Sequence, residues 1–344
     1  MGGFMKKIFL AFSLFVVGFA NTGSASNYHS SIKTICDKTA EFKAGLCMKP
    51  DEVKEYLIFA KAAYADTREK YLKILADKGW TYKEIGSIGG IGAGLVAFKD
   101  KKVIVAYHGT ESAVDWAINL NAKSQTASEF GLTGNMHQGF YAGSIASWGR
   151  FKDAILQHIK KEKIKPEDVE YFAIGHSLGG AIASVAGLRI AKDEDLTGST
   201  KSKKDNNQVK VITVGQPRVF MKSKSAAGYE ALLGSHNVLR FWNSGDPVSA
   251  VPLGTHGFKH VGTSIRLSDY ESVLDEVKTL GVKQLLSHFM KKHLVFAYEN
   301  DISSVFESYQ KKPITHKGIV KFAEKCAKDI CKWAWSKAKK VVGK

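Results

Sequence analysis

The sequence predicts an α/β protein with a mostly parallel central sheet that is covered by helices. Short apolar runs rich in β-branched residues recur along the chain, and stretches with helical periodicity lie between them. Several of these runs are followed by glycine or polar residues at their carboxyl ends. This pattern favours a mostly parallel sheet whose strands end at a common carboxyl edge. Because parallel sheets bind ligands at that edge, we expect the active site there.

The first half of the chain predicts two helices and a strand pair. Residues 51–66 predict a helix, because their apolar residues form one stripe. The apolar runs 94–98 and 103–107 predict two strands, which a charged turn joins. A long helical stretch over residues 138–161 follows.

The second half predicts three more sheet strands. The β-prone run 169–174 leads through a glycine-rich turn into a small-residue helix over 181–191. The runs 209–214 and 238–242 predict two further strands. The charged segment 192–208 between them predicts a surface insertion without a chemical role.

The N-terminus predicts export. Residues 1–25 have the pattern of a secretory signal peptide, with Lys6 and Lys7 before the apolar run 8–20 and small residues up to Ala25. The apolar run is shorter than the roughly 20 residues that cross a bilayer. We therefore expect a secreted or periplasmic protein.

Export makes the cysteines candidates for disulfide bonds rather than for metal ligands or catalytic thiols. Cys36 and Cys47 lie in the N-terminal segment 26–50, and Cys326 and Cys331 lie near the C-terminus. Four cysteines allow three pairings, and the sequence does not choose among them.

The chain carries a formal charge of +17, and the excess is concentrated in the C-terminal tail, residues 311–344. The tail has eleven lysines against Glu324 and Asp329, and Trp333 and Trp335 lie among them. A basic amphipathic helix with tryptophans fits an anionic membrane surface. The alternative is a terminal helix that packs its apolar side on the domain. No nucleic-acid recognition motif accompanies the charge, so a nucleic-acid partner is not expected.

The segment from Gly175 to Gly179, with the sequence GHSLG, has the pattern of a nucleophile elbow. In such an elbow, glycines permit a tight turn from a strand into a helix, and the turn holds the serine oxygen above the sheet. A β-prone run precedes this segment and small residues follow it, as the elbow requires. The nucleophile predicted from this pattern is Ser177, with its hydroxyl exposed at the elbow.

A serine nucleophile needs a histidine base that a carboxylate orients, in the chain order serine, acid, histidine. Asp246 follows the strand run 238–242 directly and is the best acid. The candidates after it are His256, His260, His288 and His293. His256 and His260 lie so soon after Asp246 that little chain is available to return over the sheet edge. Of His288 and His293, we favour His293.

Hydrolysis of an ester also needs two backbone N–H donors for the oxyanion. One donor is expected from Leu178, the residue after the nucleophile. The other is expected from Thr110, in the turn that follows the strand run 103–107.

Taken together, these motifs resemble the class 3, fungal-lipase-like family of α/β-hydrolases, and they occur in the order of that family. They are the His108-Gly109-Thr110 turn, Asp115-Trp116, the segment His137 to Phe140, the segment Gly175 to Gly180, the segment Thr213 to Val219 and the segment Asn243 to Pro252. The resemblance spans roughly residues 51–300 and predicts one catalytic domain over 51–310.

The resemblance implies Ser177 as nucleophile, Asp246 as acid, and Thr110 and Leu178 at the oxyanion hole, with His260 as a non-catalytic histidine. It also implies a lid around residues 111–120, where Trp116 and Ile118 are candidates for lid or acyl-pocket contacts. In the family an aromatic residue lies three positions after the catalytic histidine, and Phe296 stands there relative to His293. Two residues depart from the family pattern: His108 replaces an arginine, and Phe296 replaces a tyrosine.

The function predicted from these residues is the hydrolysis of fatty-acyl esters, as a triacylglycerol lipase or a phospholipase A. The alternatives are a carboxylesterase or thioesterase for small soluble substrates and a non-catalytic membrane-binding protein that keeps the fold. The scattered histidines and the cysteine spacing give no metal site, and this chemistry needs no cofactor.

Overall fold

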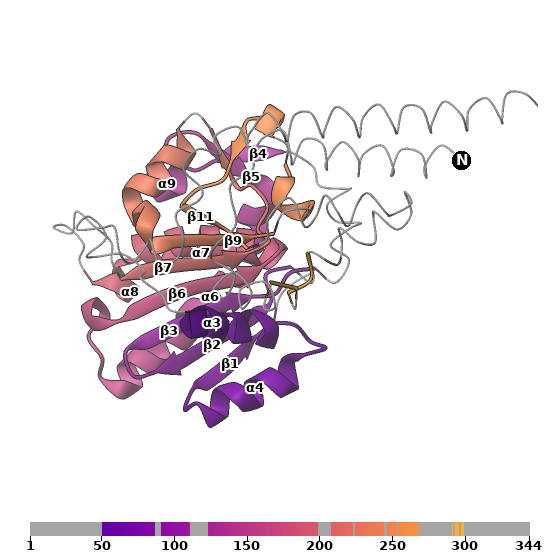
Figure 1. The fold of residues 1–344 in the computed structure, drawn as a ribbon. Coiled ribbons are helices and arrows are strands. Elements are labelled where there is room, and N and C mark those ends of the chain that lie inside the picture. The colour runs from indigo at the N-terminus through magenta and orange to yellow at the C-terminus, as the bar shows by residue number, and fades with distance from the viewer. Residues whose placement is uncertain are drawn as a thin grey trace, which may run out of the picture.

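The structure is a computed structural model, and Figure 1 shows its fold. It describes residues 50–86, 91–110, 123–198, 208–222, 224–243, 246–252, 254–267, 291, 293–295 and 297–298. Several predictions fall outside these residues: the signal peptide, the four cysteines, Trp116 and Ile118, His288 and the tail 311–344.

The main sheet of the described residues has seven strands in the order β1-β2-β3-β6-β7-β9-β11. The first three strands are antiparallel neighbours, and the five from β3 to β11 run parallel to one another. Their bounds are β1 Thr81–Ile85, β2 Gly94–Lys99, β3 Lys102–Tyr107, β6 Glu170–His176, β7 Val209–Val214, β9 Val238–Trp242 and β11 Thr263–Arg266. The prediction of a mostly parallel sheet is confirmed.

Helices cover both faces of this sheet (Figure 1). One face packs against α6, α7 and α9, and the other against α3 and α4. The helices are α3 Pro50–Ala62, α4 Arg68–Asp77, α6 Gln138–Glu162, α7 Leu178–Lys192, α8 Glu194–Thr197 and α9 Ser225–Leu233. Among the described helices, none has the length and apolar character needed to cross a bilayer.

The alternation of side chains along each strand divides the core into two clusters. On β3, Val103 and Val105 face α6 and α7, whereas Ile104 and Ala106 face α3 and α4. All four side chains are buried, because both faces of the sheet are covered. This burial explains why the strands read as continuous apolar runs.

A second, smaller sheet has the strand order β10-β8-β5-β4 and is antiparallel. Its strands are β4 Ser124–Thr126, β5 Asn135–His137, β8 Phe220–Met221 and β10 Phe258–Lys259. Short 3-10 turns lie at η2 Ser128–Phe130, η3 Pro166–Asp168, η4 Ser235–Asn237, η5 Val248–Ala250 and η6 Gly254–His256. The sequence analysis did not predict this sheet, because its strands have only two or three residues.

The first predicted helix ends earlier than its apolar stripe suggested. The prediction extended to residue 66, whereas α3 ends at Ala62. The Thr67 hydroxyl donates to the Lys61 carbonyl at 2.7 Å, and the Arg68 guanidinium donates to the Ala63 carbonyl at 3.1 Å. These side chains satisfy carbonyls at the helix end, so the chain can turn there towards α4.

Candidate active site

Ser177 lies in the turn between β6 and α7, as the elbow pattern predicts. Its backbone has φ +59° and ψ −129°, a conformation that non-glycine residues rarely adopt. A Cβ on Gly175 would lie 2.3 Å from the Gly179 backbone, and one on Gly179 would lie 2.3 Å from the Tyr107 carbonyl oxygen. The two glycines therefore allow β3, β6 and α7 to approach closely at the turn.

The structure brings Ser177, His293 and Asp246 together. His293 Nε2 lies 2.8 Å from Ser177 Oγ, and His293 Nδ1 lies 2.9 Å from each carboxylate oxygen of Asp246. A carboxylate only accepts hydrogen bonds, so Nδ1 carries the proton and donates it. In the neutral imidazole Nε2 is then an acceptor that faces the serine hydroxyl, which is the tautomer required of a general base.

The serine is more enclosed than we expected. An elbow serine was expected to expose its hydroxyl, whereas Ser177 has no exposed surface in this structure, and His293 is 2% exposed. The expectation of an exposed hydroxyl is therefore wrong for this conformation. The imidazole of His293 lies against Oγ, and the turn at Gly109 is so close that a Cβ there would lie 3.0 Å from Ser177 Cβ.

The loop that carries Asp246 is held by several hydrogen bonds. The Val248 N–H donates to Asp246 Oδ1 at 2.8 Å, and His260 Nε2 donates to the Ser249 carbonyl at 2.7 Å. Arg218 Nη1 donates to the carbonyls of Ala250 and Pro252. Burial holds the pKa of His260 well below its usual value and lowers the pKa of Arg218 to about 10. His260 therefore supports the loop that carries Asp246.

Tyr298 completes the surroundings of the carboxylate, and the sequence analysis missed it. Its hydroxyl donates to Asp246 Oδ2 and accepts a hydrogen bond from the Asn243 backbone N–H at 3.2 Å. The side chain is fully buried. The family pattern directed attention to Phe296, but the hydroxyl comes from a tyrosine five positions after His293. The available signal was that Tyr298 is the only tyrosine in the apolar stretch 285–298.

Tyr298→Phe should reduce turnover of a soluble ester by roughly tenfold or more, because a hydrogen bond to a charged group contributes about 1.5–3 kcal/mol. Without this bond the carboxylate can rotate, and it then orients His293 less well. The measurement is kcat and KM on a chromogenic short-chain ester. Tyr171→Phe is the matched control, because its buried hydroxyl donates to the Leu196 carbonyl at 2.6 Å, away from Ser177. Equal turnover of the two variants would contradict this role.

The two residues predicted to form the oxyanion hole lie at the same edge of the sheet. Leu178 is the first residue of α7 and is buried. Thr110 follows β3, whose last residue Tyr107 pairs with Gly175 on the parallel strand β6. The turn before Thr110 packs on the start of α7, since a Cβ on Gly179 would lie 2.7 Å from the His108 carbonyl oxygen. The topology therefore places both backbone segments beside Ser177.

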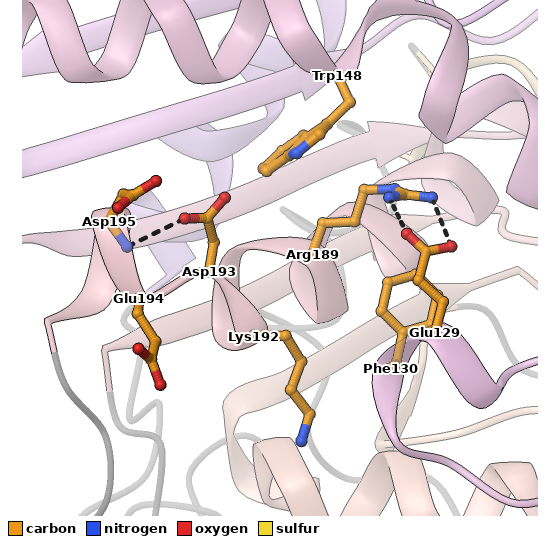
Figure 2. Close-up of a pocket in the computed structure, with 8 residues that line it drawn as sticks. All are labelled: Glu129, Phe130, Trp148, Arg189, Lys192, Asp193, Glu194 and Asp195. Atoms are coloured by element: carbon orange, nitrogen blue, oxygen red, sulfur yellow. Dashed lines mark hydrogen bonds and ion pairs between the residues drawn. The ribbon is translucent and has the colours of Figure 1, made fainter.

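A separate cavity lies at the other end of α7 (Figure 2). Its volume is about 330 Å³, and its lining includes Arg189, which is roughly 16 Å from the start of the helix at about 1.5 Å per residue. Its charges are largely paired: Arg189 with Glu129 at 2.5 Å, and Lys152 nearby with Asp193 at 2.8 Å. We assign this cavity no part in the chemistry of Ser177. Among the described residues, no cluster of histidine, cysteine or acidic side chains has the arrangement of a metal site.

Comparison with known proteins finds similarity to lipases. The profile of the family described as Lipase (class 3) matches residues 104–256. The secreted mono- and diacylglycerol lipase 1 of Fusarium solani is 24% identical over 56% of this chain and 55% of its own length. The secreted mono- and diacylglycerol lipase A of Penicillium cyclopium is 30% identical over 35% of this chain and 34% of its own length. This chain thus spans about half of the first relative and about a third of the second.

A solved structure shows the same fold. The Rhizomucor miehei lipase propeptide complex matches with a TM-score of 0.52 at 20% identity, over 65% of this chain and 68% of that chain. The parallel sheet, the strand-to-helix elbow and the helices on both faces define the α/β-hydrolase fold. Within that fold, residues 104–256 of the chain match the class 3 lipase family.

Proposed function

We propose that this protein is an exported serine hydrolase that cleaves fatty-acyl ester bonds in lipids. One observation carries the proposal: the imidazole of His293 lies between Ser177 Oγ at 2.8 Å and the Asp246 carboxylate at 2.9 Å. This arrangement can deprotonate a serine and stabilise the imidazolium that forms. The relatives named above as mono- and diacylglycerol lipases favour glycerides among the possible lipid esters.

The reaction follows from the positions of these groups. Ser177 Oγ attacks the ester carbonyl carbon while His293 Nε2 takes the hydroxyl proton. The tetrahedral oxyanion accepts hydrogen bonds from the backbone N–H groups of Thr110 and Leu178. When the carbon–oxygen bond breaks, His293 returns its proton to the leaving alcohol and an acyl-serine remains. Water, deprotonated by His293, then releases the fatty acid and restores the serine.

A panel of esters tests the substrate class. The mature protein is assayed on mono-, di- and triacylglycerols, on phospholipids and on short water-soluble esters and thioesters, with Ser177→Ala as control. We expect the highest kcat/KM on glycerides or phospholipids. Preference for the short soluble esters would replace the lipid assignment with the carboxylesterase alternative. A lack of Ser177-dependent turnover on every ester, with binding to lipid retained, would favour the non-catalytic alternative.

We also propose export and attachment to an anionic lipid surface. The predicted signal peptide, residues 1–25, supports export, and two relatives are named as secreted proteins. The lysines of the tail 311–344 supply the charge for surface attachment, at about 1 kcal/mol for each lysine near the membrane. Trp333 and Trp335 would then insert at the interface.

Removal of residues 311–344 should sharply weaken binding to phosphatidylglycerol vesicles and leave soluble-ester turnover unchanged. Binding of the full-length protein should also fall as salt rises, because exposed charges are screened over about 10 Å at 0.1 M salt. Vesicle co-sedimentation at low and high salt measures both effects. The double variant Trp333→Ala/Trp335→Ala keeps the charge and separates insertion from attraction. Unchanged binding after truncation would show that the tail is a solvated helix, and loss of folding would show that it belongs to the core.

A further inference from the structure

His176 lies directly before Ser177, and both nitrogens of its buried ring have partners. Nε2 lies 2.7 Å from the backbone carbonyl oxygen of His293, and Nδ1 lies 2.6 Å from the hydroxyl of Tyr64. The two imidazole rings, of His176 and His293, have centroids 4.7 Å apart. One side chain thus connects the end of β6 with the backbone that carries the candidate base.

The partners determine where the proton of His176 resides. A carbonyl oxygen only accepts, so Nε2 carries the proton and donates it to His293. In the neutral ring Nδ1 is then an acceptor, and the Tyr64 hydroxyl donates to it. Burial and the neighbouring charge of His293 hold the pKa of His176 well below its usual value. A neutral His176 keeps positive charge away from His293, which must become an imidazolium during the reaction.

In the turn after His293, two described N–H groups donate to the Leu294 carbonyl. The Ala297 N–H donates to the Leu294 carbonyl at 2.9 Å, and the Tyr298 N–H donates to the same carbonyl at 3.4 Å. In a regular α-helix the Ala297 N–H would donate to the His293 carbonyl. Since buried carbonyl groups need partners, the His176 ring provides a donor for the His293 carbonyl at 2.7 Å.

Tyr64 extends the connection to the turn that contains Thr110. Its hydroxyl lies so close to Gly109 that a Cβ on this glycine would be 2.2 Å away. Burial raises the pKa of Tyr64, and a hydrogen bond with the Gly109 backbone acts in the opposite direction. The Tyr64 hydroxyl therefore lies against the turn 108–110 while it donates to His176.

We propose that His176 and Tyr64 are positioning residues that hold the His293 backbone and the 108–110 turn in a fixed relation to Ser177. The connection runs from the turn at Gly109, against which the Tyr64 hydroxyl lies, through the His176 ring to the His293 carbonyl. It makes no contact with the reacting atoms. It acts on the backbone of His293, which carries the base, and on the turn 108–110, which carries the oxyanion donor Thr110. This proposal rests on the proposed function, because it concerns the geometry of that reaction.

Tyr64→Phe tests the connection by removing a single oxygen atom. Without the hydroxyl proton, the Nδ1 of His176 has no donor, and the ring can change tautomer and withdraw its proton from the His293 carbonyl. We expect kcat per active site, with active sites counted by covalent labelling of Ser177, to fall by about tenfold to a hundredfold. This is the range expected when reacting groups shift by up to about 1 Å. KM should stay within about twofold of wild type, because no contact with substrate is removed.

The readout separates positioning from loss of stability. Active sites are counted by titration with a fluorophosphonate that labels Ser177, so that unfolded molecules do not contribute to kcat. Tyr171→Phe is the matched control, because it removes a buried hydroxyl with a 2.6 Å bond on the same strand as His176. If Tyr64→Phe and Tyr171→Phe have the same kcat for each titrated site, the proposal is overturned.

A pair of substitutions at His176 decides the question if Tyr64→Phe does not fold. His176→Gln places an amide N–H near the position of Nε2 and can still donate to the His293 carbonyl, whereas His176→Asn is too short. We expect His176→Gln to retain at least about fivefold more kcat for each titrated site than His176→Asn. Equal or reversed values would overturn the proposal. A wild-type protein that neither hydrolyses esters nor reacts with the fluorophosphonate would instead contradict the proposed function.

Discussion

Ser177→Ala is expected to abolish ester hydrolysis, with a loss of roughly 10⁶-fold in kcat, while the chain remains folded. The nucleophile oxygen is removed, so no acyl-serine forms. The backbone at φ +59° strains alanine no more than serine, and the hydroxyl has the His293 bond at 2.8 Å. Losing that bond should cost about 1 kcal/mol of unfolding free energy.

The measurement is turnover of a glyceride and of a soluble ester, together with thermal unfolding. Ser184→Ala is the matched control on the same helix, because it deletes a buried hydroxyl that lies 3.1 Å from the Gly180 carbonyl and 3.1 Å from Gln216 Oε1. The control should keep activity within about threefold of wild type, since Ser184 has no contact with His293. Residual activity of Ser177→Ala within about tenfold of wild type would reject Ser177 as the nucleophile.

His293→Ala should cause a loss of similar size, between about 10⁴-fold and 10⁶-fold in kcat/KM. The serine hydroxyl then has no base to take its proton, and the Asp246 carboxylate has no imidazolium to stabilise. His288→Ala is the comparison, because His288 is the other candidate for the base in the apolar stretch 285–298. We expect His288→Ala to stay within a few-fold of wild type on a soluble ester. An inactive His288→Ala beside an active His293→Ala would show that His288 is the base.

The arrangement of strands was largely readable from the sequence. The runs 209–214 and 238–242 match the bounds of β7 and β9, and the runs 94–98 and 103–107 differ from β2 and β3 by a single residue at one end. The covered sheet buries both sides of each strand, so the residues that form it are a continuous apolar run. The nucleophile elbow could also be predicted, because its glycines and serine lie within five consecutive residues.

Contacts between segments that are distant in the sequence could not be predicted from such local patterns. The bond between His293 and Ser177 joins residues 116 positions apart, and the sequence alone left several histidines as alternatives for the base. The hydroxyl of Tyr298 and the bond of Tyr64 to His176, across 112 positions, were not predicted at all. A tyrosine in a helical stretch has the same local signature whether its hydroxyl faces a lipid, a carbonyl or a carboxylate.

The sequence by itself determined the fold class, the order of the strands along the chain and the residue most suited to be the nucleophile. These depend on apolar periodicity and on glycines that allow close approach, and both are properties of short segments. Only the tertiary structure decided which histidine lies against Ser177, how enclosed that serine is and which tyrosines complete the hydrogen bonds. These depend on where His293 and Tyr298 pack, and the folded core sets that position rather than the residues beside them in the sequence.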